Sequence, residues 1–86
     1  MPTISSFFGI LVRMFYADHG PPHFHADYQG ERASFDFDGN LIAGEMRSRV
    51  ALRLIREWAG LHGLDLEDDW RRAQEGLPLN YIEPLR

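Results

Sequence analysis

The sequence predicts an α+β fold, in which an antiparallel β-meander of three to four strands packs on one face against two C-terminal helices. In the first half of the 86-residue chain, apolar and polar residues alternate in short runs that turn signals separate, which is typical of strands. In the second half, apolar residues recur at helical spacing. No linker, repeat or low-complexity segment interrupts the chain, so we expect a single domain over residues 1–86.

The first predicted strand covers residues 10–16, after a short lead-in that ends at Gly9. Its two faces carry Ile10, Val12, Met14 and Tyr16 on one side and Leu11, Arg13 and Phe15 on the other. Because both faces are largely apolar, we expect this strand to be central or covered by a partner.

A Gly20-Pro21-Pro22 turn introduces a histidine-bearing strand that runs to Tyr28. The prolines exclude a helix here and favour an extended backbone. Because side chains alternate along a strand, three polar side chains share one face and three others share the opposite face. The two sets are His23, His25 and Asp27 against Phe24, Ala26 and Tyr28.

Gln29-Gly30 predicts a two-residue hairpin loop, since glycine adopts positive φ readily, and the third strand then runs over residues 32–37. With Tyr28 opposite Glu31, the polar face pairs Asp27 with Arg32, His25 with Ser34 and His23 with Asp36. The other face holds Phe24, Phe35, Ala26, Ala33, Phe37 and Tyr28. A register shifted by one residue would mix polar and apolar side chains on both faces.

Asp38-Gly39-Asn40 predicts a second turn, a short strand near residues 41–45 and then a helix over residues 47–62. The expected buried stripe of this helix is Val50, Leu54, Ile55, Trp58 and Leu61, with Ala51 and Ala59 beside it, and its opposite side carries Arg49, Arg53, Arg56 and Glu57. We expect Gly63 to cap this helix and Asp65 to begin a second one that ends near Glu75. The second helix is expected to bury Leu66, Trp70 and Ala73, and residues 80–85 to form an edge strand or a docked extension.

Composition limits the chemistry. The chain has no cysteine, which excludes disulfides and thiolate metal sites, and all nine basic residues are arginine, which excludes a catalytic lysine. The net charge of −4 does not favour RNA as a partner. No apolar run reaches the ~18 residues of a membrane span, and the N-terminus lacks a signal-peptide pattern. We therefore expect no membrane association and a cytoplasmic location.

Several segments together resemble a known family. They are Met1-Pro2-Thr3-Ile4-Ser5, Phe7-Phe8-Gly9-Ile10, Asp18-His19-Gly20-Pro21-Pro22-His23-Phe24-His25-Ala26, the helix from Leu52 to Trp58, and Ile82-Glu83-Pro84-Leu85. In this order they are similar to domain-of-unknown-function family 4160 (DUF4160), which consists of small bacterial single-domain proteins. The resemblance implies no assigned reaction. It suggests a component of a toxin–antitoxin-like gene pair, beside another small protein.

The histidine-bearing face is a candidate site for a divalent transition metal ion. His23 and His25 can direct both imidazoles at one ion, with Asp27 or His19 as a third ligand and Asp36 orienting an imidazole from behind. Zinc, nickel, copper and iron(II) all accept this ligand set, so the cofactor stays open. The structural alternative is a polar outer face whose histidines only hydrogen-bond to their neighbours.

Two further readings use the same face. In acid–base catalysis, His23 and His25 act as general acid and base with Asp36, while Arg13 and Arg32 hold a phosphate and Asp18 is a further binding residue. In a binding role, Leu11, Phe15 and Arg13 contact a protein partner or a second copy of the chain. We expect a partner-binding component of a toxin–antitoxin-like module; the alternative is a small metal-dependent hydrolase or ribonuclease-like enzyme.

Overall fold

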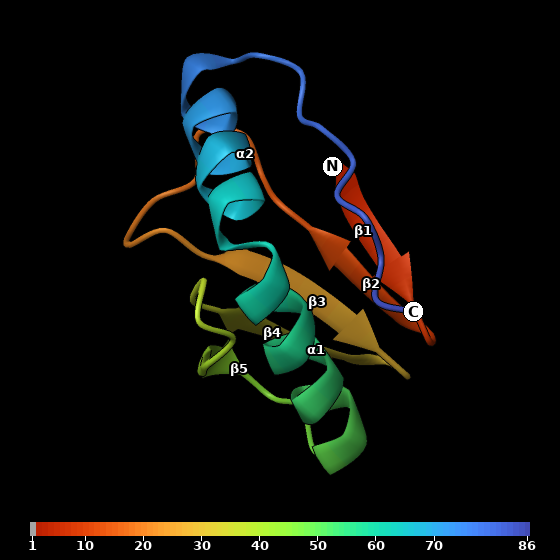
Figure 1. The fold of residues 1–86 in the computed structure, drawn as a ribbon. Helices are drawn as coiled ribbons and strands as arrows, with labels where there is room; N and C mark the ends of the chain where they lie inside the picture. Colours follow the sequence, from red (N-terminus) through yellow and green to blue (C-terminus); the bar gives the residue numbers. More distant parts are fainter. Residues whose placement is uncertain (1) are drawn as a thin grey trace.

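A computed structural model describes residues 2–86 and shows a five-stranded antiparallel sheet with two helices on one face (Figure 1). In chain order, which is also the order in the sheet, the strands are β1 (Thr3–Phe7), β2 (Ile10–Arg13), β3 (Phe24–Tyr28), β4 (Glu31–Phe35) and β5 (Leu41–Gly44). The helices α1 (Arg49–Leu61) and α2 (Gly63–Glu75) follow. The α+β meander is confirmed, but the prediction of three to four strands was too low.

Strand β1 lies in the segment that the sequence predicted to be a lead-in. Phe8 and Gly9, with φ of 49° and 81°, form the two-residue turn that joins it to β2. Phenylalanine is unusual at positive φ, so this hairpin lacks the Asn-Gly type of signal. Ser5 also breaks the alternation expected of a strand, because this polar residue is fully buried. Its hydroxyl donates to the carbonyl oxygen of Ile82 over 3.0 Å.

The β3–β4 hairpin has the predicted register. Gln29 and Gly30 have φ of 48° and 83°, as a type I′ turn requires. The pairs are Phe24 with Phe35, His25 with Ser34, Ala26 with Ala33, Asp27 with Arg32 and Tyr28 with Glu31. On the other side of β3, Arg13 of β2 lies opposite His25. The polar side chains of three strands therefore share the sheet face that the helices leave open.

The core lies between the apolar sheet face and the helices. Trp58 of α1 is 0% exposed, and its ring centroid lies 5.5 Å from those of both Phe7 and Phe24. Removing a buried aromatic of this kind costs about 3–5 kcal/mol. Val50 and Leu61 were wrongly expected in this core and are 53% and 67% exposed. At 3.6 residues per turn they lie roughly 100° or more around α1 from the centre of its buried stripe.

The two helices meet at a single residue. Ser48 caps α1 by accepting from the N–H of Ala51 over 3.1 Å, and His62 is both the last cap of α1 and the first cap of α2. Gly63 and Asp65 therefore lie in the first turn of α2, and their predicted capping roles were wrong. Asp65 instead pairs with the imidazole of His62 over 3.1 Å.

After α2 the chain runs along the outer edge of β1 (Figure 1). The N–H of Ile82 donates to the carbonyl oxygen of Ile4 over 2.7 Å, and the indole N–H of Trp58 donates to that of Glu83 over 3.0 Å. The tail is thus a docked extension, one of the two expected arrangements. Neither α1 nor α2 is long and apolar enough to cross a membrane, a finding that covers residues 2–86.

Candidate metal site

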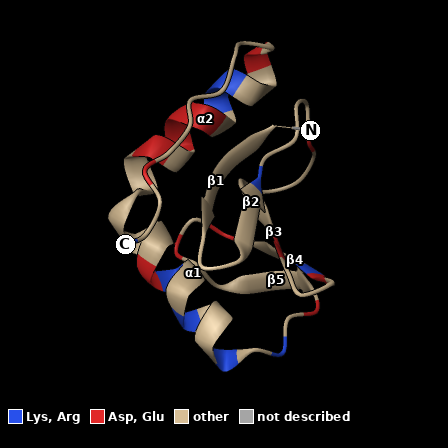
Figure 2. Ribbon diagram, turned by 90° about the vertical axis from the view of Figure 1, so that its right-hand side faces the viewer, with Lys and Arg blue, Asp and Glu red and all other residues tan. Residues whose placement is uncertain are grey.

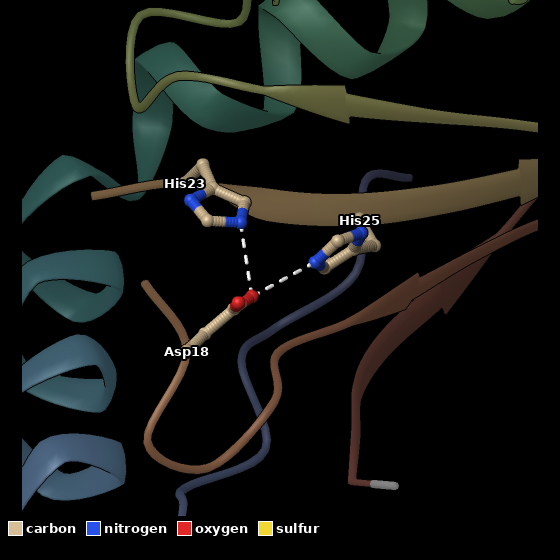
Figure 3. A group of neighbouring side chains, drawn as sticks. All are labelled: Asp18, His23 and His25. Carbon is tan, nitrogen blue, oxygen red and sulfur yellow. Dashed lines mark hydrogen bonds and ion pairs between the residues drawn. The ribbon is translucent and has the colours of Figure 1, made fainter. Parts of the chain in front are cut away.

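Asp18, His23 and His25 converge near the start of β3, with both imidazoles turned toward one carboxylate (Figure 3). Oδ2 of Asp18 lies 2.9 Å from Nε2 of His23 and 3.1 Å from Nε2 of His25. One donor atom from each residue lies within 4.8 Å of the other two. The structure therefore gathers two imidazole nitrogens and one carboxylate oxygen at a single point.

The loop between β2 and β3 brings Asp18 to the histidines, and α2 holds that loop in place. The backbone N–H of Ala17 donates to the carbonyl oxygen of Ala73, and the side-chain amide of Gln74 donates to the carbonyl oxygen of Asp18, both over 3.2 Å. The backbone N–H of His19 donates to Oδ1 of Asp18 over 2.9 Å. This last bond turns Oδ2 toward the imidazoles.

The second nitrogen of each ring also has a partner. Nδ1 of His23 donates to the carbonyl oxygen of Pro21 over 2.7 Å, and Nδ1 of His25 lies 3.2 Å from the hydroxyl of Ser34. The predicted contact between His25 and Ser34 is thus present. Metal-ligating histidines typically have such a partner behind them, because it fixes the ring and directs the other nitrogen at the ion.

Aromatic side chains shield the site on two sides. The ring centroid of Phe15 lies 4.2 Å from that of His25, and the ring centroid of Trp70 in α2 lies 5.3 Å from that of His23. The side chains of His23, His25 and Asp18 remain 11%, 26% and 24% exposed. The donor atoms are therefore partly desolvated and still reachable from solvent.

Two opposing effects set the pKa of Asp18. Partial burial raises it, while the hydrogen bonds with His25 and with the N–H of His19, together with the charges of the two imidazole rings when protonated, lower it. The lowering effects win, so the pKa of Asp18 lies below its ordinary value. Asp18 is therefore a carboxylate anion at neutral pH.

The sequence predicted Asp27 or His19 as a third ligand. In the part of the chain that the structure describes, residues 2–86, both side chains lie outside the cluster of Asp18, His23 and His25. Asp27 pairs with Arg13 over 3.2 Å and with Arg32 over 3.4 Å. His19 is exposed, and it is its backbone N–H that contacts Asp18. Asp18, expected only as a general binding residue, takes the third position. Strand alternation does not reveal how a loop folds back on a strand, so spacing alone missed this role.

Asp36 does not act behind His23 in the structure. Strand β4 ends at Phe35, so the ladder stops before the expected pair between Asp36 and His23. Oδ1 of Asp36 instead accepts from the N–H groups of Asp38 and Asn40 over 3.0 and 2.9 Å and closes the turn to β5. Burial raises the pKa of Asp36, but the hydrogen bonds from Asn40, Asp38 and Gly39 outweigh it and lower the pKa overall.

Arg13 and Arg32 lie on the open sheet face with Asp27 between them. The Arg13 side chain is 21% exposed and that of Arg32 is 72% exposed. Both guanidinium groups contact the same carboxylate oxygen of Asp27, so an incoming phosphate would compete with Asp27 for them.

Comparison with known proteins gives a match to one family model. No curated protein and no solved structure matches the chain. A family model described as "Domain of unknown function (DUF4160)" matches residues 9–71, which is more than half of the chain and includes all three residues of the cluster. The chain therefore belongs to the DUF4160 family.

Proposed function

We propose that the protein binds a divalent transition metal ion through Asp18, His23 and His25 and acts as a small metal-dependent hydrolase. The observation that supports this is the convergence of Oδ2 of Asp18 on both Nε2 atoms, at 2.9 and 3.1 Å. Two ligands bound at about 2.0–2.1 Å to a tetrahedral zinc ion lie roughly 3.3 Å apart. Small side-chain shifts would therefore accommodate an ion between these atoms.

The ligand set suits catalysis. Two histidines and one carboxylate recur in catalytic zinc sites and in non-haem iron sites, where three protein ligands leave a position for water or substrate. An ion bound in this way lowers the pKa of its water toward ~7 and supplies a nucleophile at neutral pH. Phe15 and Trp70 line the imidazoles on two sides, and the partial exposure of Asp18 and His25 leaves the remaining side accessible.

A metal-free, ribonuclease-like reaction is the competing enzymatic proposal. In it, protons take the place of the ion between Asp18 and the two imidazoles, and the histidines act as acid and base. The net charge of −4 and the contacts of Arg13 and Arg32 with Asp27 count against a phosphodiester substrate.

Metal analysis tests the main proposal. Protein prepared without a histidine tag and dialysed against zinc should retain close to one ion per chain, and the His23→Ala/His25→Ala variant should retain none. His62→Ala is the matched control, because His62 is also a partly buried imidazole paired with a carboxylate, that of Asp65, over 3.1 Å. Full retention of zinc by the double variant would refute the site.

An activity screen separates the two enzymatic proposals. Ester, amide and phosphodiester substrates are tested with the zinc-loaded protein, before and after treatment with EDTA. Hydrolysis that EDTA abolishes and zinc restores supports the metal-dependent enzyme. Hydrolysis that survives EDTA and is lost in the His23→Ala/His25→Ala variant supports the metal-free reaction instead.

We also propose a partner-binding role in a toxin–antitoxin-like module of the bacterial cytoplasm. The resemblance described in the sequence suggests this role, and the large apolar side chains left exposed on the structure support a binding surface. They include Phe8, Leu41, Ile42 and Val50. Co-expression with the product of the neighbouring gene should yield a complex that copurifies, and should change the effect of this protein on growth. A protein that stays monomeric and copurifies with nothing would contradict this role.

A further inference from the structure

We infer that the exposed side of α1, from the β1–β2 turn to β5, binds a partner segment that combines acidic and apolar side chains. This inference rests on the partner-binding role proposed above and adds the surface and its chemistry. It does not involve Asp18, His23 or His25. The surface consists of two neighbouring hollows that share Arg53 of α1.

The first hollow lies between α1 and β5 and has a volume of about 290 Å³. It is lined by Gly39, Leu41, Leu52, Arg53 and Arg56. The second has a volume of about 340 Å³ and is lined by Phe8, Tyr28, Val50, Ala51, Arg53 and Leu54. Hollows at the small end of the ligand-pocket range suit single side chains of a partner rather than a large cofactor.

Apolar side chains stand in solvent around both hollows. Phe8 is 60% exposed, Val50 is 53% exposed and Leu41 is 40% exposed. Covering such side chains gains about 25 cal/mol for each Å² removed from water. Aromatic residues and arginine, which meet here, are the residue types enriched at protein interfaces. The apolar part of the partner is expected to fill these hollows.

Three arginines give the surface its charge. Arg49, Arg53 and Arg56 are exposed on α1, and within residues 2–86 none of them forms an ion pair. The other six of the nine arginines each pair with an aspartate or glutamate. Figure 2 shows several arginines along α1, whereas acidic residues are the more frequent charged residues along α2. Guanidinium groups without a carboxylate partner favour a ligand that supplies carboxylates.

The same charges argue against a second copy of the chain as the occupant. A two-fold dimer through this surface would bring the arginines of one copy toward those of the other, and such like-charge contacts are costly. Nucleic acid is also less suited than an acidic peptide. The whole chain carries a charge of −4, which repels the phosphate backbone of a nucleic acid.

Strand β5 supplies a way to hold the segment. It is the last strand in the sheet order and pairs with β4 on one side, so its outer backbone groups face away from the sheet. An extended segment can add to such an edge and send alternate side chains toward the flanking helix. Placed there, its apolar side chains reach the hollow beside Leu41 and its carboxylates reach Arg53 and Arg56.

An NMR titration with a defined peptide tests the inference. The probe is a ten-residue peptide with glutamate and leucine in turn at every second position and serine between them, so that both share one face of an extended strand; the control peptide has glutamine in place of glutamate. The acidic peptide should bind saturably and shift the amide signals of Leu41, Arg53 and Arg56, and the glutamine peptide should bind at least tenfold more weakly. The Arg53→Glu/Arg56→Glu variant should lose at least tenfold in affinity.

The matched control variant is Arg71→Glu/Arg86→Glu, which makes the same change in net charge elsewhere and should bind like the wild type. Equal binding of both peptides, an equal loss in the control variant, or shifts on another face would overturn the inference. So would tighter binding of a twelve-nucleotide single-stranded RNA through the same arginines.

If the neighbouring gene's product copurifies equally with wild type and Arg53→Glu/Arg56→Glu, the partner role stands and this surface is wrong. If it copurifies with neither, both fail.

Discussion

The imidazole of His23 donates from Nδ1 to the carbonyl oxygen of Pro21 over 2.7 Å. Because a carbonyl oxygen can only accept, this bond fixes a proton on Nδ1 and leaves Nε2 facing Oδ2 of Asp18, 2.9 Å away. A ring between two acceptors needs either a second proton or a bound cation on Nε2. The proline turn therefore orients Nε2 of His23 toward Asp18, in addition to directing the chain into β3.

Zinc is expected to raise the thermal stability of the protein. At a free zinc concentration 100 times the dissociation constant, binding to the folded state alone adds about 2.7 kcal/mol. For a chain of this length that corresponds to a rise in Tm of roughly 10–20 °C. Circular-dichroism melts with zinc and with EDTA measure the difference, which should vanish in Asp18→Asn and in His23→Ala.

His19→Ala is the control for this prediction, since the His19 side chain lies outside the cluster and its backbone N–H is kept. It should retain the full zinc-dependent shift. If His19→Ala loses the shift while His23→Ala keeps it, the ligand assignment in the loop is wrong.

Asp18 is expected to make stability fall in acid. Its pKa is lower in the folded protein than its ordinary value of 3.8, so its stabilising effect is complete above that value and is lost as pH falls through the folded pKa. In EDTA, Asp18→Asn should be about 1 kcal/mol less stable than wild type at pH 7, and the difference should shrink below pH ~4. Urea unfolding at several pH values measures it. A constant difference between pH 7 and pH 2.5 would contradict this origin.

Asp69 is expected to destabilise the fold when ionised. Its side chain is 0% exposed, Oδ1 accepts from the N–H of Asn80 over 2.8 Å, and Oδ2 has no partner within residues 2–86. Burial raises the pKa of Asp69 above 3.8, and the neighbouring Asp68 and Asp65 add to this, against the hydrogen bond from Asn80 and the charge of Arg72. Asp69→Asn keeps an acceptor for Asn80 and removes the charge.

Because the pKa is raised, stability is lost as pH rises from 3.8 through the folded pKa. Asp69→Asn should therefore be about 1 kcal/mol more stable than wild type at pH 7 and nearly equal to it at pH 3. Asp68→Asn is the control with the opposite sign, since hydrogen bonds from Arg71 and Arg72 lower the pKa of Asp68. A loss of stability in Asp69→Asn at pH 7 would show that the ionised form has a favourable partner.

The sequence predicted the structure best where polar and apolar residues alternate regularly. Alternation and the Gln29-Gly30 turn predicted the β3–β4 register, and with it the shared face of His25, Asp27 and Ser34. The same reasoning failed at β1, where Phe8 occupies a turn position that its residue type rarely takes. Helical periodicity also places Asp69, three residues after Leu66 and four before Ala73, on the buried stripe of α2.

The candidate site was predicted in part. His23 and His25 were identified because they share a strand face and flank a single residue. The third member, Asp18, reaches them through a loop whose path depends on Ala73 and Gln74, more than fifty residues away in sequence. Contacts of that range have no local signature, so the sequence offered His19 or Asp27 as the third residue, and only the structure brings Asp18 to the histidines.

Arg13 and Arg32 are expected to differ in their effect on stability, although both contact Asp27. Arg13 is 21% exposed and Arg32 is 72% exposed, so the bond to Arg13 is less screened by solvent. Arg13→Ala should cost about 1 kcal/mol, because it leaves a partly buried carboxylate with one exposed partner. Arg32→Ala should stay within about 0.5 kcal/mol of wild type. Equal costs in urea unfolding would contradict this ranking.

Ile82 is expected to hold the tail against the sheet. It is 3% exposed, its N–H donates to Ile4 over 2.7 Å, and its carbonyl oxygen accepts from the hydroxyl of Ser5 over 3.0 Å. Ile82→Ala keeps these backbone bonds and removes the buried side chain, which should cost about 2–4 kcal/mol. Tyr81→Ala, at a neighbouring position that is 61% exposed, should stay within about 0.5 kcal/mol of wild type.

The two substitutions also differ in what they do to the edge of β1. Loosening Ile82 uncovers the outer backbone groups of β1, and uncovered strand edges pair with other chains. Ile82→Ala should therefore lose amide hydrogen-exchange protection at Ile82 and associate with itself at high protein concentration, whereas Tyr81→Ala should do neither. If Ile82→Ala keeps wild-type protection and stays monomeric, the tail is held mainly by its backbone and by the bond from Trp58 to Glu83.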